Sequence, residues 1–194
     1  IKPKLLVKEG DHVSLGDALF FDKVNPEVKW PSIAAGTISK IVYGERRAVL
    51  DIIIEIDEIK EKNLDPIDKK NLSSKEEVKD FIQSNNLWPF FTQRPFNKVV
   101  NPEDNPKCII VSLADSSPLA NDLSFSIAEK KDHIVSALLN IKKLTDGNLY
   151  VAVRGDNFSF LSDYDFITLV QVEGPHPSGN VGVILNRINP LNQN

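Results

Sequence analysis

The amino-acid sequence predicts a protein of mixed α+β and α/β class, in which a small β barrel or sandwich is followed by an α/β domain with a mostly parallel sheet. Residues 1–58 contain short segments of alternating apolar and polar side chains separated by turn signals. Residues 99–194 alternate strand-like apolar runs with helical patterns. Closely spaced short strands favour a barrel or sandwich, whereas strand–helix–strand order favours a parallel sheet.

The composition narrows the functional classes. A formal net charge of −4 lacks the basic excess, with a pI above about 9, that is typical of nucleic-acid-binding domains. Cys108 is the only cysteine, which rules out an internal disulfide and a cysteine-based zinc or iron–sulfur site. The three histidines show no ligand spacing, so no metal site is expected. His133 is expected to be a surface or packing residue of a helix.

The chain is expected to be an internal fragment that does not span a membrane. No apolar run reaches the about 18 consecutive residues that a transmembrane helix needs. The sequence opens at Ile1 without an initiator methionine and closes in Asn-Pro-Leu-Asn-Gln-Asn after a helical pattern.

Five strands are expected in the N-terminal segment, because apolar and polar residues alternate there between turn signals such as Glu9-Gly10-Asp11. These strands are Leu5–Val7, Ala18–Phe21, Val28–Trp30, Gly36–Val42 and Val49–Ile56.

Residues 59–98 are expected to connect the two parts. Up to Lys75 the segment is rich in Lys, Glu, Asp and Asn, as surface linkers are. Ser74 and Glu77 match a capping box, which predicts a short helix to about Asn85. The proline-broken aromatic stretch Trp88–Phe96 cannot be a regular helix. It either fills a core or docks onto a neighbouring protein.

The domain at 99–194 is expected to contain strands and helices in alternation. The expected strands are Cys108–Leu113, Leu149–Val153 and Phe166–Val172, and the expected helices are Ala128–Leu144 and one beginning in Val181–Ile188.

Lys23 carries one candidate function. The residues Val7–Val13, Gly16–Leu19 and Asp22-Lys23, with Pro31 downstream, look like a lipoyl or biotinyl carrier domain, in which a modified lysine stands at an exposed hairpin tip. Asn25-Pro26 beside the lysine departs from that pattern, as does Tyr43–Arg47 in place of a second Glu-Gly-Asp turn. We therefore expect a shared fold with Lys23 unmodified. A carrier with Lys23 as attachment point is the alternative.

The segment Gly174–Gly182, which contains Pro175, His176 and Gly179, is the strongest site-like feature of the second half. It follows a strand and precedes a helix, where α/β sheets bind anions through backbone amides. It lacks the dinucleotide and P-loop fingerprints, and its prolines remove two amide donors. A structural turn and a ligand or partner contact both remain open, as does a stand-alone flavin- or nucleotide-binding enzyme.

Two further polar segments are weaker candidate sites. Arg46 and Arg47 are expected in a solvated hairpin turn, although paired arginines can also grip a carboxylate or phosphate of a partner. Asp115–Pro118 follows a strand, but no nucleophile elbow surrounds Ser116 or Ser117. A polar turn is therefore expected there.

Together these pieces resemble the NqrA family, whose members belong to the Na+-translocating NADH:quinone oxidoreductases, a group of bacterial respiratory complexes. The resemblance covers nearly the whole chain. The residues that carry it are Lys2–Val13, Asp22-Lys23, Asn25-Pro26, Ala35–Ile38, Gly44–Arg47, Arg94–Phe96 and Gly174–Gly179. It also extends to the C subunit of the Rnf complex, which is similar in joining a barrel-sandwich hybrid segment to a Rossmann-like domain.

The resemblance implies a peripheral, non-catalytic subunit on the cytoplasmic side of the bacterial inner membrane. Its partners would be the other subunits of the complex, especially the membrane-embedded ones, and a quinone is a further candidate. FMN, FAD, riboflavin and the iron centres would belong to other subunits, with no cofactor in this chain. Quinone or partner contacts would fall on Gly174, Pro175, His176, Gly179, Arg46 and Arg47.

Overall fold

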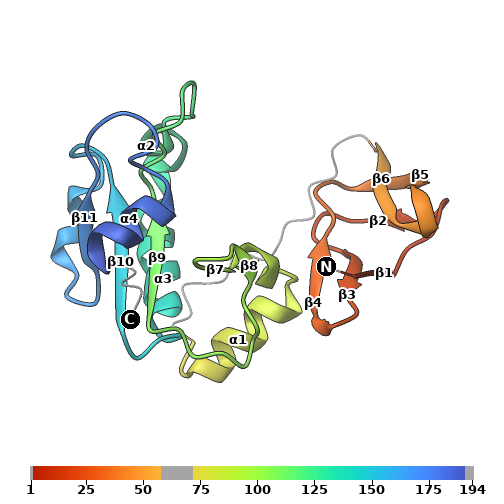
Figure 1. Ribbon diagram of the computed structural model, residues 1–194, viewed down its shortest axis with the longest axis horizontal. Helices are drawn as coiled ribbons and strands as arrows, with labels where there is room; N and C mark the ends of the chain where they lie inside the picture. Colours follow the sequence, from red (N-terminus) through yellow and green to blue (C-terminus); the bar gives the residue numbers. More distant parts are fainter. Residues whose placement is uncertain (1, 58–71, 191–194) are drawn as a thin grey trace. The chain divides into compact units, whose positions relative to one another are not determined.

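The computed structural model describes residues 2–57 and 72–190, which form two compact units (Figure 1). Among these residues, the first unit contains 2–57 and 79–103, and the second contains 72–78 and 104–190. The boundary falls inside helix α1 (Lys75–Ser84). Residues 79–103 thus group with the β segment, although the sequence pattern predicts a connection over 59–98. Most of the expected charged linker lies outside the described residues.

Two three-stranded antiparallel sheets build the β part of the first unit, in the orders β1-β3-β4 and β2-β5-β6. The strands are β1 (Pro3–Leu5), β2 (His12–Val13), β3 (Ala18–Asp22), β4 (Asn25–Pro31), β5 (Gly36–Tyr43) and β6 (Val49–Ile56).

The core of this unit draws side chains from both sheets. Leu19 of β3 packs in one cluster with Val13 of β2 and with Ile38 and Ile41 of β5. Partly buried residues around them come from strands of both sheets and from the loop after β1. Because the alternating residues of each strand point to one shared interior, the sequence pattern and the sandwich arrangement agree.

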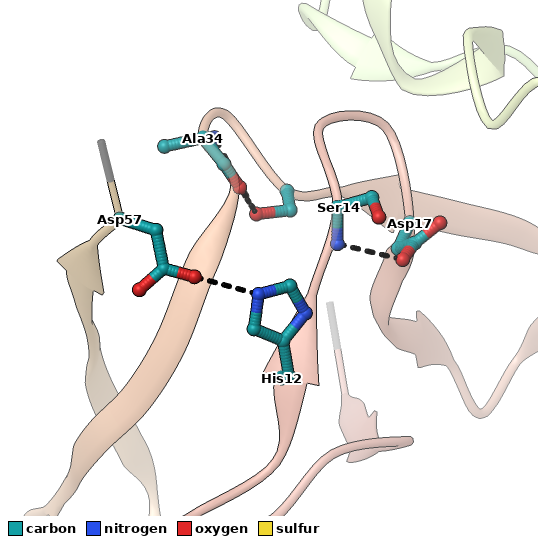
Figure 2. A network of polar contacts seen from close by, with 6 residues as sticks. His12, Ser14, Asp17, Ala34 and Asp57 are labelled. Carbon is teal, nitrogen blue, oxygen red and sulfur yellow. Dashed lines mark hydrogen bonds and ion pairs between the residues drawn. The ribbon is translucent and has the colours of Figure 1, made fainter. Parts of the chain in front are cut away.

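Polar contacts close the β part where regular pairing stops. His12 Nε2 and Asp57 Oδ2 lie 2.7 Å apart, which links β2 to the residue that follows β6 (Figure 2). The Asp17 carboxylate accepts a 2.7 Å hydrogen bond from the Ser14 backbone N–H in the turn before β3. The buried Ser32 hydroxyl donates to the Ala34 carbonyl at 2.6 Å. These contacts satisfy turn groups that no ladder hydrogen bond serves.

The aromatic stretch of the first unit is divided between core and surface. Trp88, in a short 3-10 turn (η2, Trp88–Phe90), is 4% exposed and donates its indole N–H to the Val100 carbonyl at 2.8 Å. Phe90 and Phe96 are 70% and 75% exposed. Phe96 lies at the tip of a small hairpin formed by β7 (Thr92–Gln93) and β8 (Lys98–Val99). Both sequence alternatives therefore describe part of the stretch.

A parallel sheet in the order β11-β10-β9 forms the second unit. Its strands are β9 (Cys108–Ser112), β10 (Asn148–Val153) and β11 (Thr168–Gln171). Its helical elements are α2 (Leu123–Ile127), η3 (Ala128–Lys130), α3 (Lys131–Lys142), η4 (Ser159–Asp163) and α4 (Val181–Ile188).

Alternate residues of the central strand β10 face two different helical layers. Leu149, Val151 and Val153 pack in a cluster with Leu138 of α3 and Leu161 of η4. On the opposite face, Ala152 packs with Ile184 of α4 and with two other buried residues that follow strands, Ala114 and Val172. Helices therefore cover both faces of the parallel sheet, as this kind of sheet requires. The predicted parallel α/β sheet is confirmed.

The expected elements differ from the structure mainly at their ends. The strand expected at Leu5–Val7 is β1, which already begins at Pro3, because its pairing with β3 runs from Pro3–Asp22 to Leu5–Phe20. The helix expected over Ala128–Leu144 begins with the 3-10 turn η3 and ends at Lys142. The capping box is present, since the Glu77 N–H donates to the Ser74 hydroxyl at 3.2 Å.

Helix α2 has no counterpart in the sequence pattern. It is short, and Ser, Asp and Asn around it favour turns in isolation. Asp122 stabilises its start by accepting hydrogen bonds from the Ser124 N–H at 2.9 Å and the Ser124 hydroxyl at 2.6 Å. Leu123 and Ile127 then pack against the core. The helix is thus supported by packing that propensity alone does not reveal.

Two isoleucines of the β part allow a matched stability test. Ile38 is fully buried and Ile56 is 69% exposed. We expect Ile38→Ala to lower the free energy of unfolding by about 2–5 kcal/mol, because it leaves a cavity in the core. Ile56→Ala should change it by less than about 0.5 kcal/mol. Tryptophan fluorescence during urea unfolding reports on this unit, because Trp30 and Trp88 both belong to it. Equal effects of the two substitutions would contradict the assigned core.

Candidate functional site

The carboxyl ends of three parallel strands bring the site-like loops of the second unit to one edge of the sheet. One loop follows β9 and contains Ser116, a second follows β10 and contains Arg154, and a third follows β11 and contains Gly174–Gly179. Parallel strands end at a common edge, which is where open α/β sheets bind ligands. The described structure places the predicted turn at this edge.

The Gly174–Gly179 turn is held by hydrogen bonds to its own backbone and to the loop after β10. The Gly174 carbonyl accepts from the Ser178 hydroxyl at 3.0 Å and from the Arg154 guanidinium at 3.1 Å. Ser178 is 4% exposed, and its backbone N–H donates to the Pro175 carbonyl at 3.0 Å. Gly174 has a φ of +98°, which glycine adopts without the strain of a Cβ.

His176 lies on the exposed side of this turn and contacts the loop after β9. Its Nδ1 lies 3.3 Å from the Ser116 hydroxyl oxygen. The same oxygen accepts a hydrogen bond from the Gly179 N–H at 2.8 Å. Ser116 therefore bridges the imidazole to the end of the turn, across a sequence separation of 60 residues. The sequence pattern at Ser116 predicts no more than a polar turn.

Gly179 permits this close approach because it has no side chain. A Cβ at this position would lie 2.0 Å from the Ala114 carbonyl oxygen and 2.9 Å from the Ser116 hydroxyl oxygen. Both distances are shorter than van der Waals contact. Since the first clash is with backbone, neighbouring side chains cannot relieve it by rotating. The glycine thus lets the turn lie directly against the end of β9.

Asp115 does not complete a hydrolytic triad with Ser116 and His176. Its carboxylate accepts a 2.8 Å hydrogen bond from the Ser117 backbone N–H. That bond, followed by one from the Ser117 hydroxyl, holds the pKa of Asp115 below its usual value, with a smaller contribution from the charge of His176. In a triad, the carboxylate would instead hydrogen-bond and orient the imidazole. The arrangement thus suits binding better than nucleophilic catalysis.

Arg46 and Arg47 occur in the other unit, in the connection η1 (Glu45–Arg47) between β5 and β6. Both are exposed and have left-handed φ values of 55° and 59°. The Arg47 guanidinium lies 5.8 Å from the centre of the Tyr43 ring, a cation–π distance. Tyr43 also lines an open surface hollow of about 350 Å³ with Val7, Lys8, Glu9 and Ile41. The expected hairpin turn is confirmed.

Lys23 stands at the tip of the β3–β4 hairpin. The pairing of Asp22 with Asn25 leaves Lys23 and Val24 as a two-residue turn, and both are exposed. The Asp22 carboxylate accepts hydrogen bonds from the backbone N–H groups of Val24 at 3.1 Å and Lys2 at 3.2 Å. The sequence pattern suggests that Asn25-Pro26 interrupts the strand, but both residues belong to β4. That departure from the carrier pattern therefore has no counterpart in the fold.

Two residues of the carboxyl edge, Ser116 and Arg154, are absent from the site residues that the sequence predicts. Each follows a predicted strand of the parallel sheet, as the Gly174 turn does. The signal that identifies them is a polar residue at the end of each of the three strands. His133, by contrast, is exposed on α3, as expected.

Residues 2–57 and 72–190 contain no cluster of three or more His, Cys, Asp or Glu side chains arranged to hold a metal ion. Among the same residues, no helix combines the length and the apolar character that crossing a membrane requires.

The fold and the site define a protein in which a barrel-sandwich β unit that presents exposed hairpins is joined to a parallel α/β unit with loops gathered at its carboxyl edge. The chain belongs to the NqrA family. Residues 1–57 match the NqrA N-terminal barrel-sandwich hybrid domain, and residues 73–194 match the NqrA second alpha/beta domain. The resemblance seen in the sequence is confirmed.

Curated relatives, each named as the NqrA component of a Na(+)-translocating NADH-quinone reductase, agree with this assignment. The chain is 35% identical over 193 residues to the relative from Photorhabdus laumondii, covering 98% of this chain and 43% of that protein. It is 33% identical to that of Yersinia pseudotuberculosis, covering 100% and 44%. It is 34% identical to that of Pseudomonas aeruginosa, covering 98% and 43%. The chain thus spans less than half the length of these relatives.

The exposed tip makes the modification state of Lys23 a sharp test. We expect Lys23 to be unmodified, because the second Glu-Gly-Asp turn of the carrier pattern is replaced by the η1 connection. Intact mass of the protein isolated from its native source, with peptide mapping across Lys23, measures this directly. Lys29 on β4 serves as the reference lysine. An added lipoyl or biotinyl mass at Lys23 would favour the carrier function instead.

Proposed function

We propose that this chain is part of the NqrA component of a Na+-translocating NADH:quinone reductase, where it serves a structural and interaction role. The observation that carries the proposal is the match of both units, in order, to the two NqrA domains. The names of the curated relatives support it. The complex oxidises NADH, reduces a quinone and exports Na+, and this chain takes part without supplying the chemical step.

The proposed location is the cytoplasmic face of the bacterial inner membrane, with the membrane-embedded subunits of the complex as the main partners. Exposed features of each unit offer separate contacts for them, namely Arg46 and Arg47 in one and the Gly174–Gly179 turn in the other. The acidic net charge gives no support to a nucleic-acid partner.

The Gly174–Gly179 turn is proposed as a preformed contact for a partner subunit or a quinone. Its hydrogen bonds to Ser116, Arg154 and Ser178 hold the backbone before any ligand arrives. Such a loop loses little conformational entropy on binding. His176 is exposed on this turn, and an imidazole can donate a hydrogen bond to a carboxylate or to a quinone carbonyl.

Redox cofactors are proposed to reside in other subunits. FMN, FAD, riboflavin and the iron centres would lie outside this chain, as would the NADH site. The turn that follows β11 lacks the glycine fingerprint of dinucleotide-binding domains. Pro175 and Pro177 also remove two amide donors from the place where a phosphate would be held.

His176→Ala tests the proposed contact. We expect the variant to fold about as stably as the parent, because His176 is exposed and contributes no core packing. Assembly of the complex or its quinone reductase activity should fall at least several-fold. Co-purification of the full-length protein with membrane fractions and quinone-dependent NADH oxidation measure the two effects.

His133→Ala is the matched control for that experiment, because His133 is an exposed histidine on α3, away from the carboxyl-edge loops. It should leave assembly and activity unchanged. Normal assembly and turnover of His176→Ala would remove His176 from the function of the complex.

Cofactor binding gives an independent test. The 194-residue chain should bind neither FMN nor NADH with a Kd below about 1 mM, which corresponds to about −4 kcal/mol. Isothermal titration calorimetry measures this directly. Micromolar binding of either molecule would instead support a stand-alone flavin or nucleotide enzyme that uses the Gly174 turn.

A further inference from the structure

The imidazole of His176 is held through one nitrogen only. Among the described residues its hydrogen-bond partner is Ser116, whose hydroxyl oxygen lies 3.3 Å from Nδ1. The ring is otherwise exposed. Since Nδ1 and Nε2 of a neutral imidazole have opposite roles, one donating and the other accepting, the partner of Nδ1 decides what Nε2 offers to a ligand.

The second contact of Ser116 decides the direction of the first. The Gly179 N–H can only donate, so at 2.8 Å the Ser116 oxygen is its acceptor. The hydroxyl has a single hydrogen to give. Among the hydrogen bonds of Ser116 in the described structure, His176 Nδ1 is the one partner able to accept it. The resulting chain of donors runs from Gly179 N–H to Ser116 O–H to His176 Nδ1.

We infer that Ser116 is a positioning residue that holds neutral His176 as the Nε2–H tautomer, with Nε2–H facing outward as a donor for an acceptor oxygen of the ligand. The inference rests on the proposed contact function of His176. It extends that function by naming the chemistry of the ligand atom, a carbonyl or carboxylate oxygen. It also explains why the Gly174–Gly179 turn lies against β9, because only that approach delivers the Gly179 N–H to Ser116.

Neighbouring side chains are already committed elsewhere. Asp115, next in sequence, accepts from the Ser117 N–H, and Arg154 donates to the Gly174 carbonyl. Ser116 is thus the group that can orient the ring. Ser117 lies in the same turn, has no hydrogen bond to His176 among the described contacts, and makes a matched control.

Nitrogen-15 NMR of the 194-residue chain tests the tautomer directly. Signals of the three histidines are assigned by substituting His12 and His133. At a pH where His176 is neutral, we expect Nε2 to show the shift of a protonated ring nitrogen and Nδ1 that of an unprotonated one. Ser116→Ala should give averaged shifts of mixed tautomers, and Ser117→Ala should leave the spectrum unchanged.

A protonated Nδ1 in the parent chain would overturn the inference, and so would an unchanged His176 signal in folded Ser116→Ala. Far-UV circular dichroism checks folding of the variant. Because the parent spectrum alone decides the tautomer, the inference remains testable even if Ser116→Ala does not fold.

The assembled complex separates this inference from the proposed function. Full-length protein carrying Ser116→Ala should weaken the contact about fivefold, the value of one ordinary hydrogen bond. A raised KM for quinone with normal assembly identifies a quinone carbonyl as the acceptor, whereas reduced co-purification identifies a carboxylate of a partner subunit. If His176→Ala impairs the complex and Ser116→Ala does not, the positioning role is wrong and the contact stands. If neither variant has an effect, the proposed contact itself is wrong.

Discussion

The common direction of three strands is the constraint on which the second unit depends. Because β9, β10 and β11 are parallel, the loops at their carboxyl ends must share one edge of the sheet. Polar contacts then join these loops in pairs, with Asn157 donating to Ser124, Arg154 to the Gly174 carbonyl, and the Gly179 amide to Ser116. An antiparallel order would have sent one loop to the opposite edge and separated Ser116 from His176.

The first unit follows a different principle. Its sheets are antiparallel, so successive strands are joined by local connections such as the Lys23–Val24 turn and the Glu45–Arg47 helix. Such connections project singly from a shared core. The same architecture serves carrier domains, which need an isolated lysine at a tip. It serves equally well a protein whose exposed hairpins meet partners, and for that reason the fold alone does not identify the function.

Backbone contact, more than side-chain chemistry, shapes the candidate site. Gly179 lies so close to Ala114 that a Cβ would overlap its carbonyl oxygen, and the buried Ser178 hydroxyl is used on the Gly174 carbonyl. The turn is therefore a rigid support that leaves His176 exposed. A rigid exposed donor is suited to recognition, because its orientation is set before the ligand binds.

Local sequence determined the elements and their order. The alternation in Gly36–Tyr43, the capping box at Ser74–Glu77 and the glycine–proline segment after β11 each act through neighbours in the chain, and each predicted its structure. Tertiary structure alone decided which strand ends meet, that Trp88 is buried while Phe96 is exposed, and that Ser116 bridges His176 and Gly179. The physical reason is that burial and loop-to-loop hydrogen bonds join residues far apart in sequence, and no local period records which distant partner a residue will find.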